Sequence, residues 1–225
     1  MESFGEKVVH FHFGLKPKTR LPGGAKWILP FNEKATQKSM HSFFSKFYND
    51  QNSRIFLFGI NPGRFGAGVT GVPFTDPIRL EQECKIKNDF HKRAELSSIF
   101  VYEVIKALGG ANAFFQKYYI TSCCPIGFTK DGKNYNYYDD KVLEKSVTPF
   151  IKKNIKTQLK FGSHSTVFSM GQGKNYKFLK QLNDKHHFFK EVIPLPHPRW
   201  VMQYRLKYKE DYINEYVTKL SMAYR

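Results

Sequence analysis

The chain has 225 residues, with 41% hydrophobic and 16% aromatic residues, which suits one folded domain and argues against an intrinsically disordered protein. The formal net charge of +17 indicates a polyanionic partner. We expect that partner to be nucleic acid first and an anionic membrane surface second. No apolar stretch approaches the ~20 residues of a membrane helix.

Turn signals dominate the beginning of the chain. Pro17, Pro22-Gly-Gly24 and Pro30 predict an irregular N-terminal segment over residues 1–35. Helical spacing of apolar residues then predicts a helix over 36–48. The short apolar run over 55–59 predicts a buried, parallel strand.

This strand leads into Asn61-Pro62-Gly63. Pro62 restricts Asn61 to an extended conformation, and Gly63 permits a sharp turn. Ligands of open α/β sheets bind outside the carboxyl ends of the strands, so Asn61 is a candidate site residue, and an ordinary turn is the alternative. Residues 61–80 continue as a long Gly- and Pro-rich loop, and unstructured loops of this length tend to be functional.

Helices and strands alternate in the remainder of the chain. Further helices are predicted over 97–108 and over 205–222. A long helix is predicted over 139–159, with a kink or a break at Pro149. Another helix is predicted to follow the segment Gly171–Asn175 and to end at residue 182. Further strands are predicted over 117–122, 165–170 and 187–193, with a polar loop and an Asp131-Gly132 turn over 129–138. The alternation predicts an α/β fold whose parallel sheet carries helices on both faces.

The cysteines indicate the redox environment of the protein and limit the metal sites that it could form. Their number is odd, two of them are adjacent, and no secretory leader is visible at Met1–Leu15, so we expect a reducing, cytoplasmic location without disulfides. No Cys-x-x-Cys or His-x-x-x-His pairing is present, and we expect neither a metal site nor a cofactor.

Each predicted strand is followed by a polar or glycine-rich position. These positions are Asn61, Ser122, Gly171-Gln-Gly173 and His197. A parallel sheet would bring all of them to one edge. His197 stands between Pro196 and Pro198, which restrict its backbone; a rigid loop whose histidine caps a helix is the alternative to a site.

Two motifs resemble a known family. Gly59-Ile-Asn-Pro-Gly63, Arg64-Phe-Gly66 and Thr70-Gly-Val-Pro-Phe74 resemble the first motif of the single-strand-selective monofunctional uracil-DNA glycosylases. His197-Pro198-Arg199 resembles the second motif of the wider uracil-DNA glycosylase superfamily. The resemblance is dense over 55–75 and thinner over 119–126 and 193–205.

The resemblance implies a three-layer α/β/α sandwich with a central, mostly parallel, four-stranded sheet, in a single domain over residues 1–225. It also implies hydrolysis of the N-glycosidic bond of a uracil flipped out of DNA, as in base excision repair, by a monomer. Asn61 would hold the hydrolytic water, and His197 would donate a hydrogen bond to the uracil O2 as negative charge develops there. Phe74 would stack on the base beside Gly59 and Ile60.

The sequence departs from the family at two places: the residue that hydrogen-bonds the edge of the base, and the loop after the second motif. Ser122 stands where the family usually has an asparagine, so xanthine or hypoxanthine could be accepted beside uracil. Trp200 and Arg205, after Arg199, suit a wedge that fills the vacated base stack. Gly171, Gly173 and Lys174 offer helix-terminal N–H groups to a DNA phosphate.

Two other functions stay open at this stage. The chain could be a non-catalytic nucleic-acid-binding protein that kept the fold. It could also be an α/β enzyme acting on a phosphorylated small molecule, with Gly171–Lys174 as the phosphate site. The charge of +17 favours DNA over a small molecule, and the presence of both Asn61 and His197 favours catalysis over binding alone.

Overall fold

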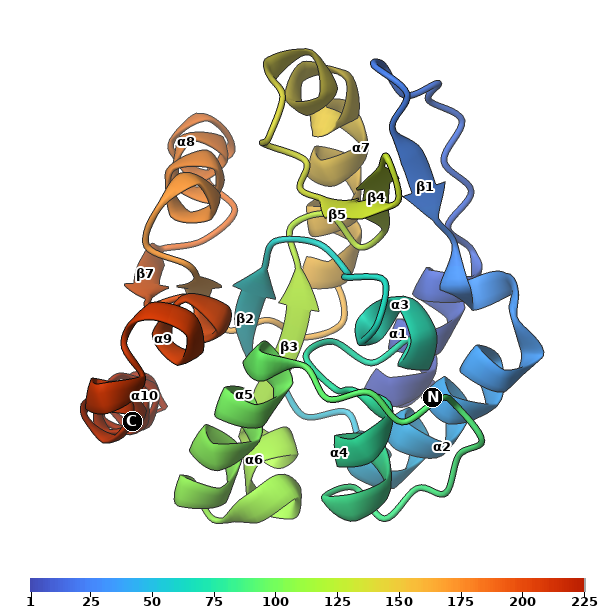
Figure 1. Ribbon diagram of the computed structural model, residues 1–225. Coiled ribbons are helices and arrows are strands. Elements are labelled where there is room, and N and C mark those ends of the chain that lie inside the picture. Colours follow the sequence, from blue (N-terminus) through green and yellow to red (C-terminus); the bar gives the residue numbers. More distant parts are fainter. Residues whose placement is uncertain (225) are drawn as a thin grey trace.

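The computed structural model describes residues 1–224 and has a sheet of four parallel strands at its centre (Figure 1). The strands lie in the order β3-β2-β6-β7, with bounds β2 (Ile55–Gly59), β3 (Tyr118–Ser122), β6 (Thr166–Met170) and β7 (Glu191–Leu195). Every residue of β2 and β3 is buried, which is expected of parallel strands that are covered on both faces. The predicted α/β fold with a parallel four-stranded sheet is confirmed.

Helices cover both faces of this sheet. The helices are α1 (Phe4–Phe13), α2 (Lys34–Phe47), α3 (Ala67–Thr70), α4 (Pro77–Gln82), α5 (Leu96–Ala107), α6 (Gly110–Lys117), α7 (Lys141–Leu159), α8 (Lys174–His186), α9 (Pro198–Tyr204) and α10 (Lys209–Ala223), with 3₁₀ turns η1 (Pro30–Asn32) and η2 (Leu206–Tyr208). On one face, Thr121 of β3 donates a hydrogen bond to Gln158 of α7. On the other, Tyr118 donates to the Leu220 carbonyl of α10 at 3.0 Å. Within residues 1–224, no helix is both long enough and apolar enough to cross a membrane.

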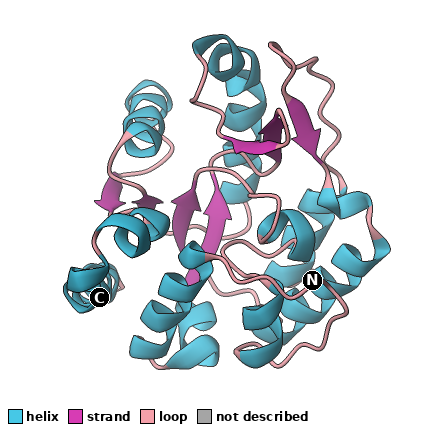
Figure 2. Cartoon of the chain, viewed as in Figure 1, coloured by secondary structure: helices cyan, strands magenta, loops and turns pink. Residues whose placement is uncertain are grey.

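A second, antiparallel sheet lies apart from the central one (Figure 2). It contains β1 (Lys26–Ile28), β4 (Gly127–Lys130) and β5 (Lys133–Tyr135). The prediction of a polar loop over 129–138 was therefore wrong, although its Asp131-Gly132 turn is present. Asp131 and Gly132 have φ values of 49° and 68°, the positive pair that joins two strands in a tight hairpin.

The N-terminal segment is not irregular, as its proline and glycine content had suggested. Residues 4–13 form α1, whose Ser3 and Glu6 make a reciprocal capping box. The helix buries Phe4, Val8, Val9 and His12, a spacing typical of one helical face. The capping box and this spacing were the two signals in the sequence that could have predicted α1.

Other boundaries also differ from the predictions. The loop over 61–80 contains α3 and the start of α4. The helix predicted over 205–222 is divided into η2 and α10, and the short helix α9 precedes it. Helix α6 was not predicted, and α7 continues through Pro149 without a break. Strand β7 extends to Leu195 because it is an edge strand, where Pro194 removes no ladder hydrogen bond to a further strand.

A buried arginine stabilises the start of β2. Arg54 is 0% exposed, and its guanidinium donates two hydrogen bonds to the Asp50 carboxylate, each at 2.8 Å. It also donates to the carbonyls of Phe115 (2.9 Å) and Asn52 (2.7 Å). The rings of Phe4 and Tyr48 lie 4.6 and 4.8 Å from its central carbon, so α1, the segment before β2 and the end of α6 meet at this one side chain.

Candidate functional site

A cavity of about 650 Å³ opens at the carboxyl ends of the central strands. Asn61 follows β2, Ser122 ends β3, Gly171 follows β6 and His197 follows β7, and all four line this cavity. Parallel strands carry their carboxyl ends to the same sheet edge, which explains how residues so far apart in the chain meet.

Ten of the twelve predicted site residues line the cavity. They are Ile60, Asn61, Phe74, Ser122, Gly171, Gly173, Lys174, His197, Arg199 and Trp200. Gly59 lies beneath Phe74, where a Cβ would stand 2.7 Å from the Phe74 ring, and Arg205 stacks on the Trp200 ring at 5.1 Å.

The amide of Asn61 is held by the segment after the β4–β5 hairpin. Its Oδ1 accepts a hydrogen bond from the Tyr137 backbone N–H at 3.1 Å, and its Nδ2 donates to the Tyr135 carbonyl at 3.2 Å. Because one partner is a donor and the other an acceptor, these contacts define which way the amide points. One lone pair of Oδ1 stays free to accept a hydrogen bond from a water.

The imidazole of His197 is held as a neutral hydrogen-bond donor. Its Nδ1 accepts from the Arg199 backbone N–H at 3.2 Å, so His197 caps α9, as the alternative reading of this position anticipated. With Nδ1 as the acceptor, the proton of the neutral ring sits on Nε2.

Burial, and then the Arg199 charge, lower the pKa of His197 to about 4, which keeps the ring neutral near pH 7.

Phe74 is held in an unusual backbone conformation at the cavity wall. Its φ of 52° lies in the left-handed region, which a bulky aromatic residue rarely adopts. The Thr70 hydroxyl fixes this turn by donating to the Thr75 carbonyl at 2.7 Å. The Phe74 and His197 ring centroids are 6.4 Å apart, so an aromatic face and a hydrogen-bond donor lie near each other in one cavity.

Ser122 lies on the cavity floor and is 6% exposed. It is paired in register with Gly59. Beyond the strands, the backbone N–H groups of Cys123 and Cys124 donate to the carbonyls of Gly59 (2.9 Å) and Ile60 (3.1 Å). These bonds fix the backbone of the floor, from which the short Ser122 side chain lines the cavity.

Gly171, Gly173 and Lys174 form the wall at the start of α8. Gly171 has a φ of 142°, and a Cβ on it would lie 3.7 Å from Cδ2 of His197. Gly173 is the N-cap of α8 and no side chain caps that helix end. The first N–H groups of α8 therefore lie beside the cavity without a side-chain acceptor.

Trp200 and Arg205 flank the cavity mouth on α9 and at its end. Trp200 is 37% exposed and packs edge-on against Tyr212 at 5.8 Å. Tyr204, which also lines the cavity, is 62% exposed. The rim therefore presents two large aromatic side chains to the solvent.

The polar or aromatic cavity residues that sequence reasoning missed include Glu95, Asn134, Asn136 and Tyr138. The three from the hairpin region lay in the segment read as a polar loop, whose tyrosines and asparagines were the only signal. Glu95 had no signal, because it precedes α5 in a stretch without a motif. Burial, and then the neighbouring Asp76 carboxylate, raise the pKa of Glu95, the one carboxylate among the cavity residues.

The structure also bears on metal binding. Over residues 1–224, no group of three or more His, Cys, Asp or Glu side chains is arranged to hold a metal ion.

Comparisons with known proteins find one matching family and a similar solved structure. The family model described as the uracil DNA glycosylase superfamily matches residues 45–221. The crystal structure of wild-type SMUG2 from Pedobacter heparinus is similar to this chain, with a TM-score of 0.96 and 44% sequence identity. That similarity covers 99% of this chain and 99% of the other. A search of curated proteins finds no match.

Proposed function

The chain belongs to the uracil DNA glycosylase superfamily, and from this premise we propose that it is a monofunctional glycosylase of base excision repair. Its substrate is uracil flipped out of DNA, and a deaminated purine is a second substrate. The observation that carries the proposal is the pairing of Asn61 and His197 in one cavity, where one amide oxygen can orient a water and one neutral imidazole can donate a hydrogen bond.

The reaction requires two events at the sugar. The oxygen of water forms a bond to C1′, and the bond from C1′ to the base nitrogen breaks with its electron pair leaving on the base. Asn61 Oδ1 would accept a hydrogen bond from the water and hold it on the face opposite the base. The water proton ultimately neutralises the departing base, so that water is consumed and no cofactor takes part.

The leaving base is where His197 would act. Glycosidic cleavage passes through an oxocarbenium-like transition state, so stabilising the leaving group can compensate for a weakly activated water. An Nε2–H aimed at the base carbonyl would stabilise the negative charge that develops there, and it does so without a proton transfer. The low pKa of His197 supports this role, since a neutral donor is available throughout the physiological pH range.

Access to DNA is supported by charge and by the rim. The charge of +17 suits a phosphate backbone, and Lys174, Arg199 and Arg205 surround the cavity mouth or stack beside it. Trp200 and Tyr204 are exposed aromatic side chains that would fill the stack left by a flipped base. A phosphorylated small molecule could bind at the α8 terminus, but that function would give these rim residues no role in binding.

A labelled oligonucleotide with a single uracil tests the proposed activity. We expect strand breakage only when alkali follows incubation, because a monofunctional glycosylase leaves an intact abasic strand. Breakage without alkali would indicate an additional lyase step. Absence of breakage together with salt-sensitive binding of the same oligonucleotide would favour the non-catalytic binding protein.

The second prediction concerns Ser122 and base specificity. An asparagine amide discriminates by pairing a donor and an acceptor with the base edge, whereas a hydroxyl rotates and reaches less far. We expect measurable excision of a deaminated purine, with xanthine ahead of hypoxanthine, because xanthine has a carbonyl at C2 as uracil does. Ser122→Asn should shift the ratio of rates toward uracil by about 1–3 kcal/mol, the value of one buried polar contact.

The measurement is the ratio of single-turnover rates on matched uracil and xanthine oligonucleotides. Ser97→Asn is a suitable control, since Ser97 lines the cavity from α5 rather than from the sheet. An unchanged ratio in Ser122→Asn would exclude Ser122 as the base reader.

A further inference from the structure

Two arginines outside the predicted site lie on one aromatic ring at the cavity rim. The guanidinium carbon of Arg64 is 4.4 Å from the centroid of Phe65, and that of Arg93 is 3.7 Å from it. Arg64 follows the cavity residue Gly63, and Arg93 precedes the cavity residue Glu95 by two positions. We call Arg64 and Arg93 the arginine pair.

The β4–β5 hairpin holds Arg64 in place, and Arg93 contacts it through the shared Phe65 ring. The Arg64 backbone N–H donates to Asn134 Oδ1 at 3.0 Å, and its side chain donates to the Gly132 carbonyl at the hairpin turn. Stacking on Phe65 occupies the faces of the guanidinium groups and leaves most of their N–H edges free. Both arginines are exposed, so these edges face solvent.

The arginine pair makes no direct ion pair within the described residues. By contrast, Arg54 and Arg79 are paired with Asp50 and Asp76. The nearest acid along the chain is Glu95, which lines the cavity. Burial, and then the Asp76 carboxylate, raise its pKa, and the charges of Arg199 and Arg93 oppose that rise. Two guanidinium groups without a carboxylate partner, stacked on one ring, provide the charge and the N–H donors that an anion requires.

We propose that the arginine pair binds a backbone phosphate of the DNA strand that carries the flipped base. This inference rests on the proposed function for the presence of that strand. Arg64 belongs to the first family-like motif, whereas Arg93 lies outside both motifs. A guanidinium edge binds two phosphate oxygens at once, which fixes position as well as charge.

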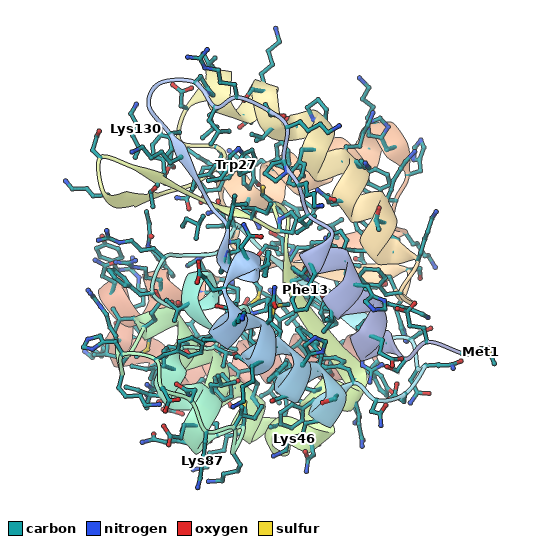
Figure 3. The ribbon with its side chains drawn as sticks, turned by 90° about the vertical axis from the view of Figure 1, so that its right-hand side faces the viewer. Met1, Phe13, Trp27, Lys46, Lys87 and Lys130 are labelled. Carbon is teal, nitrogen blue, oxygen red and sulfur yellow. The ribbon has the colours of Figure 1, made fainter. Side chains whose placement is uncertain are left out.

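The place of the pair defines the path of the strand. Lys174 and Arg199 come from α8 and α9 and line the cavity on the side of β6 and β7. Arg64 lies in the loop after β2 and Arg93 in the loop before α5, and Arg64 contacts the β4–β5 hairpin at Gly132. Figure 3 labels Lys130, which belongs to the same hairpin. A strand that crosses the cavity would therefore meet cations on both sides of the flipped nucleotide.

The salt dependence of binding tests this contact. For a single-stranded uracil oligonucleotide, each phosphate contact contributes about 0.7 to the slope of log affinity against log salt concentration. We expect Arg93→Ala to reduce the slope by about that amount. Arg93→Lys should keep the slope but weaken binding at every salt concentration, because lysine retains the charge and loses the stacked, two-pronged geometry.

Lys87→Ala is the matched control. Lys87 is exposed, precedes α5 in the same stretch as Arg93, and lies at the opposite end of the molecule from Lys130 (Figure 3). Its removal takes away the same charge and should leave the slope unchanged. An equal reduction in Lys87→Ala and Arg93→Ala, or no reduction in Arg93→Ala, would overturn the proposal.

A second measurement identifies the phosphate and separates this inference from the proposed activity. Single methylphosphonate linkages, which are uncharged, are placed in turn on either side of the lesion. We expect one position to weaken binding of the wild type and of Lys87→Ala but not of Arg93→Ala. If no position behaves in this way, the pair does not bind one defined phosphate, even where alkali treatment shows that the base is excised. If binding behaves as expected and no base is excised, the proposed activity fails and the phosphate site stands.

Discussion

Alanine at Asn61 or at His197 should lower the rate of uracil excision by about 10²–10³ each, while DNA binding changes little. Each residue is proposed to act on the reacting atoms rather than on the phosphates, so the loss should appear in the transition state. Single-turnover excision and fluorescence anisotropy on the same oligonucleotide measure the two quantities separately.

His41→Ala serves as the control for loss of a histidine, because His41 is exposed on α2. It should retain full activity. Parallel losses of binding and excision in Asn61→Ala or His197→Ala would indicate damage to the fold, and unchanged excision would remove that residue from the mechanism.

The pH dependence follows from the same histidine. The folded pKa of His197 is about 4, below its ordinary 6.5, so folding favours the neutral ring. Excision should therefore be insensitive to this group from neutral pH down to about 6 and decline as the pH approaches 4. The neutral ring stabilises the fold fully above pH 6.5, and this contribution is lost as the pH falls toward 4, because the unfolded chain binds the proton first.

The largest expected effect on stability is at Asp50. Asp50→Ala removes both carboxylate contacts of Arg54 and leaves a fully buried guanidinium without its counter-charge. Breaking such a pair by removing one partner typically costs about 3–5 kcal/mol, and we expect a decrease of that size in the free energy of unfolding. Denaturant unfolding at neutral pH measures it, since the Arg54 hydrogen bond lowers the pKa of Asp50 and keeps it charged there.

Asp184→Ala is the comparison for this prediction. It removes an ion pair with Lys180 in which the two side chains are 59% and 52% exposed. Exposed pairs contribute between about 0 and 1 kcal/mol, so its unfolding should be close to wild type. If Asp50→Ala lowers the free energy of unfolding as little as Asp184→Ala does, Arg54 finds other partners when Asp50 is absent.

Much of the central sheet was predictable from the sequence, because its signals are local. The run over 55–59 is apolar and ends in Gly59, and only a strand covered on both faces tolerates such a run. The same reasoning located β3 and β6 within one residue of their observed bounds. The edge strand β7 was predicted too early, since its Pro194 is compatible with a strand only at an edge, which is a property of the sheet.

The hairpin shows why the rest was not predictable. Strands β4 and β5 are short, polar and only partly buried, so they lack the apolar alternation that marks a strand. Their structure depends on contacts with distant segments: β1 pairs with β4, and Gly127 lies so close to the Pro62 carbonyl that a Cβ would stand 2.1 Å from that oxygen. Nothing near residue 127 in the chain indicates this neighbour.

The sequence by itself determined the central parallel sheet and brought Asn61, Ser122 and His197 to one edge of it, because parallel topology alone fixes where strands end. Only the tertiary structure decided how these side chains are oriented. The Asn61 amide is aligned by backbone groups near residue 136, the His197 proton is assigned to Nε2 by the start of α9, and Glu95 enters the cavity from a stretch without a motif. Hydrogen-bond direction and burial arise from groups that meet only after folding, so no local pattern encodes them.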